Sequence, residues 1–178
     1  MEVFAKHGFR ASALAEVAER VDLTPAGILY HFGAKESLLL AVIEERDRRA
    51  VGSMATMPAE QGLAALRSTV RFAEQSEQEP GLTALHTVLQ AESFEPDAPA
   101  HRYFRERSRL LRAMTAATLR EAQARGEVRA DVDCDATAAQ VVAFLEGAAV
   151  LWLLDDTVSL VDLYRGYFAT LTAAIGAP

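Results

Sequence analysis

Three polar side chains between residues 30 and 35 have the types and spacing needed to hold a nucleic-acid backbone. Tyr30 and His31 can each donate a hydrogen bond to a phosphate oxygen, and Lys35 can neutralise one phosphate. Lys35 opens a further predicted helix, where a basic side chain opposes the helix dipole and is compensated by an anion. Thr24 precedes a proline, and the N–H groups of a helix that begins there would attract phosphate as well.

Two short helices joined by a tight turn are predicted between residues 12 and 33, and they would position these side chains. The first helix has Ser12 as its N-cap. Its apolar stripe consists of Leu14, Val17, Ala18 and Val21. Asp22 and Leu23 then form the turn. The spacing is typical of a helix-turn-helix, whose second helix reads the major groove of DNA.

The second helix has its own start and stop signals. Thr24 is the predicted N-cap, Pro25 occupies the first helical position, and Gly33 follows the last turn as a C-cap. The residues expected to face inward are Ile28, Leu29 and Phe32. Ala26 and Gly27, in the first turn, are small enough to allow close approach to base edges or contact with a thymine methyl group.

The segment 4–44, FAKHGFRASALAEVAERVDLTPAGILYHFGAKESLLLAVIE, resembles the DNA-binding domain of the tetracycline-repressor (TetR) family. The matching landmarks are Gly8-Phe9, Ser12, Val17-Ala18, Tyr30-His31-Phe32, Lys35 and Leu38-Leu39. The resemblance implies an all-helical, dimeric protein that is usually a ligand-released transcriptional repressor. With the residue chemistry above, it gives a DNA-binding set of Ser12, Thr24, Pro25, Ala26, Gly27, Tyr30, His31 and Lys35.

Three features depart from the family pattern. Met1 falls inside the expected first helix, which should run through His7, so we expect this helix to be truncated and a basic arm to be missing. Leu29 stands where the family commonly has a tyrosine, and Tyr30 follows about 100° further round the helix. Ala34 stands where Ser or Asn usually caps the next helix.

Composition predicts an all-α chain in two domains. The 178 residues are 51% hydrophobic, contain ten glycines and six prolines, and show no clear alternating strand pattern. We expect a helix-turn-helix domain over 1–45 and a ligand-binding and dimerisation domain over 46–178. The predicted helices after the motif are 35–50, 60–78, 82–94, 100–125, 135–154 and 160–175, with a loop over 52–58 and Gly126 as a cap.

Charge and cysteine usage restrict the class of protein further. The net charge is −7, but residues 1–50 are near neutral, with seven basic and eight acidic side chains. A small DNA-reading head on an acidic body fits this distribution. The single cysteine, Cys134, excludes an intrachain disulfide. The apolar run 141–154 is interrupted by Glu146-Gly147 and is shorter than a membrane span, and no signal peptide is recognised, so we expect a cytoplasmic protein.

The two C-terminal helices, 135–154 and 160–175, carry more apolar surface than one domain would cover. An isologous interface would bury the excess, and the family resemblance implies a four-helix bundle made by two subunits. The residues expected at this homodimer interface are Val141, Leu145, Ala148, Trp152, Tyr164, Phe168 and Leu171. The alternative is that both helices lie in a monomeric core.

Helices between residues 60 and 125 carry a mixed apolar set that would suit a small apolar or weakly polar effector. The expected ligand-binding residues are Phe72, Leu85, His86, Leu89, Gln90, Phe104, Leu111 and Met114. A solid core without a cavity is the alternative. His86, His101 and Glu92 lack a metal-binding spacing, so we expect no metal and no cofactor.

No catalytic motif is recognised, so we expect no enzyme. Two other functions stay open beside a DNA-binding regulator that acts on a double-stranded operator. One is a helical small-molecule-binding protein with a truncated, weakly DNA-binding head. The other is an enzyme with an all-α body.

Overall fold

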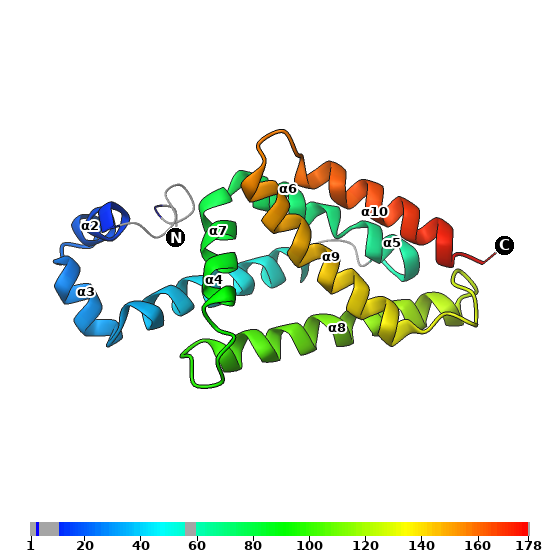
Figure 1. The fold of residues 1–178 in the computed structure, drawn as a ribbon, viewed down its shortest axis with the longest axis horizontal. Coiled ribbons are helices and arrows are strands. Elements are labelled where there is room, and N and C mark those ends of the chain that lie inside the picture. Colours follow the sequence, from blue (N-terminus) through cyan, green and yellow to red (C-terminus); the bar gives the residue numbers. More distant parts are fainter. Residues whose placement is uncertain (1–2, 4–10, 56–59, 178) are drawn as a thin grey trace. The chain divides into compact units, whose positions relative to one another are not determined.

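The computed structural model describes residue 3 and residues 11–55 and 60–177, and these residues are helical apart from turns and one isolated bridge (Figure 1). The helices are α2 (Ala11–Arg20), α3 (Pro25–Phe32), α4 (Lys35–Ala55), α5 (Gly62–Arg67), α6 (Val70–Gln78), α7 (Pro80–Ala91), α8 (His101–Ala124), α9 (Cys134–Leu154) and α10 (Leu160–Ile175). The predicted all-α class is confirmed. The predicted first helix lies outside the described residues except for Val3, which is helical and buried.

The chain divides into two compact units. Unit 1 comprises residues 1–57 and 78–104, and unit 2 comprises residues 58–77 and 105–178. Unit 1 therefore contains α2, α3, α4, α7 and the first residues of α8. The domain boundary predicted at residue 45 concerns function and stays a prediction. The compact units divide the chain differently, because α7 packs against α4 and belongs to unit 1.

The core of unit 1 joins the helix-turn-helix to α4 and α7. α4 contributes the inward-facing set predicted from the sequence, Leu38, Leu39, Val42 and Ile43, all buried. α7 contributes Leu82, Leu85 and Leu89, and the start of α8 adds Phe104. A hydrogen bond of 2.6 Å from the Tyr103 hydroxyl to the Asp47 carboxylate links α8 to α4 at the edge of this core.

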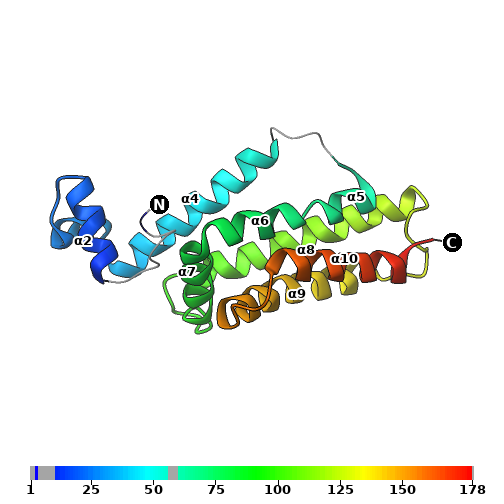
Figure 2. The same cartoon turned by 90° about the horizontal axis from the view of Figure 1, so that it is seen from above.

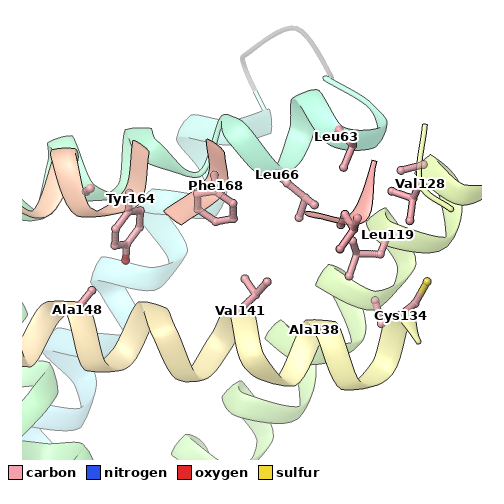
Figure 3. Packing of buried hydrophobic residues seen from close by; sticks show 14 of the residues in the cluster. Leu63, Leu66, Leu119, Val128, Cys134, Ala138, Val141, Ala148, Tyr164 and Phe168 are labelled. Atoms are coloured by element: carbon pink, nitrogen blue, oxygen red, sulfur yellow. The ribbon is translucent and has the colours of Figure 1, made fainter. Parts of the chain in front are cut away.

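The core of unit 2 lies among α5, α6, α8, α9 and α10 (Figures 2 and 3). α10 packs against both α9 and α5. Phe168 on α10 and Leu119 on α8 are fully buried, and Val141 on α9 lies beside them in the same cluster. α9 is apolar nearly all round, but this core buries only one side of it. The other side therefore keeps exposed apolar residues.

One end of unit 2 is tied together around Glu127. Gly126 ends α8 with a φ of 74°, which confirms the predicted cap. The Glu127 carboxylate then accepts a hydrogen bond of 2.8 Å from the Leu63 N–H at the start of α5 and pairs with Arg125 at 2.8 Å. The backbone of Glu127 also contacts the C-terminal residues, and the Ala177 N–H donates a hydrogen bond of 3.0 Å to the Glu127 carbonyl.

Several predicted helix boundaries are wrong, and one of them is the end of the helix expected over 82–94, which ends at Ala91. The helix expected over 60–78 is broken between α5 and α6, where the Ser68 and Thr69 hydroxyls donate to the carbonyls of Ala65 and Leu66 and compete with the helical pattern. The loop expected over 52–58 begins later, because α4 continues to Ala55 through Gly52. One glycine costs only about 1 kcal/mol inside a helix, which a long helix tolerates.

Among the described residues, α9 is long and apolar enough on its own to cross a bilayer. Length and composition alone do not separate a span from the core helix of a globular unit. Cys134, Ala138 and Val141 on α9 are buried in the core of unit 2. This burial accounts for the apolar composition of the inner side of α9 without a membrane.

Candidate nucleic-acid interface

The turn between α2 and α3 is built by local interactions that the sequence predicted. Asp22 adopts a φ of 54°, which reverses the chain direction after α2. The Thr24 hydroxyl oxygen accepts a hydrogen bond of 3.0 Å from the Gly27 N–H, and Pro25 occupies the first turn. Gly33 ends α3 with a φ of 79°. The predicted N-cap, N-terminal proline and C-cap of this helix are all confirmed.

The start of α2 differs from the prediction. α2 begins at Ala11, so Ser12 lies in its first turn and not at the N-cap position. The Ser12 side chain lies outside the described residues, and its predicted contact with DNA stays a prediction. The same applies to Lys35, the first residue of α4, whose side chain the structure does not describe.

The inward-facing residues of the motif are only partly as predicted. Leu14, Ala18 and Ile28 are buried. Val21 is 53% exposed because α2 has already ended at Arg20, which places this residue in the turn. Phe32 is 39% exposed at the last position of α3, where its ring meets the edge of the neighbouring His31 ring at 5.5 Å.

The outer face of α3 is uncharged and strongly exposed. Tyr30 is 91% exposed, and Thr24, Pro25, Ala26 and His31 are also exposed. Gly27 is half-buried under the Thr24 cap. Because the Thr24 hydroxyl oxygen already accepts one hydrogen bond, its proton stays available for an acceptor outside the helix.

The predicted effector residues fall into both compact units. Leu85, His86, Leu89 and Phe104 are buried in unit 1, where the His86 and Phe104 rings meet edge to face at 5.2 Å. The remaining members divide as follows: Gln90 is half-buried in unit 1, Phe72 and Leu111 are half-buried in unit 2, and Met114, also in unit 2, is 52% exposed. Met114 was expected to face inward, and that expectation is wrong because it lies on the outer side of α8.

Sequence reasoning missed Thr83, one turn before His86 on α7. Its side chain is 4% exposed, and its hydroxyl oxygen has no hydrogen-bond partner among the residues that the structure describes. Its position three residues before His86 was the available signal, since residues three apart share a helix face.

The predicted dimer residues are mostly turned into their own chain. Val141, Ala148, Tyr164 and Phe168 belong to the buried core of unit 2, so they have little surface left for a partner. Leu145, Trp152 and Leu171 are half-buried against the same core. Helical periodicity marked these residues as apolar, but it could not show which side of each helix the core would cover.

An excess of apolar surface on α9 and α10 was predicted, but the residues of α9 that stay exposed were not among those expected at the interface. Val150, Leu151 and Leu154 are 41%, 47% and 82% exposed. Between α9 and α10 lies an open groove of about 610 Å³, lined by Phe144, Thr157, Val158, Ser159, Asp162, Leu163, Gly166, Tyr167 and Thr170.

Aromatic stacking and a glycine shape this groove. The Phe144 and Tyr167 rings stack with centroids 3.8 Å apart, and burial raises the pKa of the Tyr167 phenol. A Cβ atom added at Gly166 would meet nothing within 4 Å, so the backbone of α10 is open to close approach. The groove is therefore lined by aromatic rings and by open backbone of α10.

The described residues contain no group of three His, Cys, Asp or Glu side chains placed to hold a metal ion. Cys134 is buried at the start of α9. The exposed, capped α3 presents polar and aromatic groups outward from unit 1, with Tyr30 the most exposed of them.

Comparison with known proteins gives matches over most of the chain. Residues 1–42 match the family described as bacterial regulatory proteins, tetR family, and residues 62–168 match the family described as tetracyclin repressor-like, C-terminal domain. None of the curated proteins matches the sequence significantly.

Several solved structures have a similar fold. One, described as the molecular basis for control of antibiotic production by bacterial hormones, is 25% identical with a TM-score of 0.72, over 99% of this chain and 93% of that chain. A putative TetR-family regulator from Rhodococcus sp. is 21% identical with a TM-score of 0.69, over 97% and 92%. CprB from Streptomyces coelicolor, solved with its operator sequence, is 22% identical with a TM-score of 0.55, over 97% and 90%.

Proposed function

Because this chain belongs to the TetR family of DNA-binding transcriptional regulators, we propose that it is a homodimeric repressor that a small organic effector releases from a palindromic operator. The observation that carries the proposal is the capped, outward-facing α3. TetR-family regulators are generally DNA-binding proteins and not enzymes, so the proposal contains no catalytic step. Such a regulator would act in the cytoplasm.

In this proposal α3 enters a major groove, and its surroundings hold the phosphates on both sides. Lys35 and His31 contact phosphates, and the Thr24 hydroxyl donates its free proton to another. Pro25, Ala26 and Gly27 bring the first turn of α3 close to base edges. Ser12 contributes from the first turn of α2. Each head reads one half-site, so two heads read a palindrome.

The groove on α10 supplies the surface for the second subunit. A partner helix would pack on Leu163 and Gly166, beside the exposed Leu151 and Leu154 of α9. In this proposal the interface does not include the buried Val141 and Phe168. It lies on the side of α9 and α10 that the core of unit 2 does not cover. Half-buried Leu145, Trp152 and Leu171 stay candidates at its edge.

The effector proposal rests on buried polarity in unit 1. Thr83 and His86 lie one turn apart on α7 and are buried in unit 1, whose core cluster is apolar and includes Leu82, Leu85 and Phe104. A buried hydroxyl without a partner costs about 1–3 kcal/mol, and an effector oxygen or N–H would recover that cost. We therefore expect a largely apolar ligand with few polar groups. The description of one structural neighbour refers to the control of antibiotic production by bacterial hormones, and this supports a small organic effector.

DNA binding is tested by selecting duplexes from a random-sequence library with the purified chain and measuring affinity by fluorescence anisotropy. We expect a palindromic consensus with two half-sites about one helical turn apart. The absence of any enriched sequence would contradict operator binding.

The dimer is tested by sedimentation of Leu154→Glu. A buried charge at the interface should give a monomer, while Leu110→Glu, a matched change at a residue 59% exposed on α8, should stay dimeric. A monomeric wild type at micromolar concentration would contradict this interface.

The effector is tested with a library of apolar compounds. A compound that binds only the DNA-free state should raise the Tm and release the selected duplex together. Thr83→Val removes the hydroxyl while keeping the shape, and it should abolish both effects of such a compound without loss of the fold. Equal responses in wild type and Thr83→Val would place the effector elsewhere.

A further inference from the structure

The outward face of α3 is centred on two residues. Ala26 and Tyr30 are four positions apart, so they lie about 40° from each other round the helix. The buried Ile28 lies two residues from each, about 160° away on the opposite side. Tyr30 therefore lies on the same outer line as Ala26, one turn further along, and not at the edge of the helix.

Neither residue can make the bidentate hydrogen bonds that identify guanine or adenine. Those contacts need Arg, Lys, Asn or Gln, and α3 has the sequence PAGILYHF, which contains none of them. What the line of Ala26 and Tyr30 offers is a methyl group, an aromatic ring and one hydroxyl. The apolar feature of the major groove that matches a methyl group and a ring is the C5-methyl group of thymine.

Among the residues that the structure describes, none holds Tyr30 against its own chain. It is 91% exposed and takes part in no ring contact or hydrogen bond among the described residues. His31 lies about 100° further round the helix, which places it toward the side of α3 and nearer to a phosphate. The aromatic side chain is thus available for the base pairs that face the centre of α3.

We propose that Tyr30, together with Ala26, determines operator specificity by apolar contact with thymine C5-methyl groups in the major groove of each half-site. The proposal rests on the docking of α3 in the major groove proposed above. It assigns Tyr30 to base reading and leaves phosphate binding to its neighbours. It also predicts a half-site whose bases facing α3 include at least one thymine.

The test uses the duplex selected by the chain and a second duplex in which deoxyuridine replaces thymidine at one position of each half-site. Deoxyuridine keeps every hydrogen-bonding group and removes only the methyl group. Loss of one buried methyl should weaken binding about fourfold, and loss of one in each half-site about 15-fold. Placing 5-methylcytosine at the corresponding position of a C·G variant should recover part of the affinity, because it restores the methyl alone.

Variants of the protein assign the effect to Tyr30. Tyr30→Ala should bind the thymidine and deoxyuridine duplexes with nearly equal affinity, whereas Tyr30→Phe should keep the discrimination because the ring is retained. Phe94→Ala removes another exposed aromatic ring, 75% exposed in the turn after α7, and should leave the discrimination unchanged. Unchanged Tm values would show that each variant folds, as the exposure of both rings predicts.

Three results would overturn the inference. Equal binding of the two duplexes by the wild type would exclude methyl reading. Equal discrimination in wild type and Tyr30→Ala would assign it to another residue. A selected half-site whose invariant positions are only guanine and cytosine would contradict the predicted thymine. Failure to select any duplex would instead count against the proposed function, so the two failures are distinguishable.

Discussion

Replacing Gly62 with alanine tests the connection that closes one end of unit 2. Gly62 begins α5 with a φ of 58°, a conformation that costs a residue with a side chain about 1–2 kcal/mol. The new Cβ atom would also clash with Oε2 of Glu127, so the carboxylate would have to leave the Leu63 N–H. The backbone cost alone predicts a fall in Tm of about 2–8 °C for a chain of this size.

A double-mutant cycle separates the two contributions. Unfolding by urea is measured for wild type, Gly62→Ala, Glu127→Ala and the double variant. In the Glu127→Ala background the clash is absent, so Gly62→Ala should cost only the backbone strain and less than it does in the wild type. Equal costs in both backgrounds, or a Gly62→Ala variant as stable as the wild type, would refute the reasoning.

The remaining predictions concern four other side chains. The Leu63 N–H, followed by Arg125, lowers the pKa of Glu127 in the folded chain, so its contribution to stability is present above about pH 4.5 and is lost as the pH falls through the lowered pKa. The stability difference between wild type and Glu127→Gln in urea titrations should therefore be larger at pH 7 than at pH 3. Thr24→Ala should lower stability by about 1 kcal/mol through loss of the α3 cap and weaken operator binding, and Thr24→Ser should restore both. Lys35→Ala should weaken binding to selected and unrelated duplexes alike and reduce the salt slope of log K by about one; a loss confined to the selected duplex would contradict a phosphate contact. Phe168→Ala should cost about 3–5 kcal/mol in the same urea titrations, because its ring is 1% exposed in the core of unit 2; a cost below about 1 kcal/mol would contradict that burial.

Features set by neighbouring residues were predictable from the sequence. The last helix was expected over 160–175 and has those bounds, and Thr24, Pro25 and Gly33 delimit α3 as expected. These signals are local, because a cap or a proline acts on the hydrogen bonds of its own helix end. The buried side of α4 was also predictable, since only one side of that helix is apolar.

Features set by contacts distant in sequence were not predictable. α9 is apolar nearly all round, so its pattern could not show that Val141 would be buried while Leu154 stays 82% exposed. The break at Ser68 depends on side-chain hydrogen bonds that compete with the helix. In the candidate DNA interface the outward position of Tyr30 follows from counting round the helix, but the partial exposure of Phe32, the last residue of α3, does not.

The compact units have a consequence for protein engineering. The backbone passes between them at residues 57–58, 77–78 and 104–105, and the last two passages lie within α6 and α8. A chimaera that exchanges only residues 1–45 would combine the α4 side chains Leu38 and Val42 of one parent with the α7 side chains of another. The hybrid core would then contain mismatched volumes. Regulators with exchanged operators are therefore expected to fold better when the transplanted piece carries residues 78–104 as well.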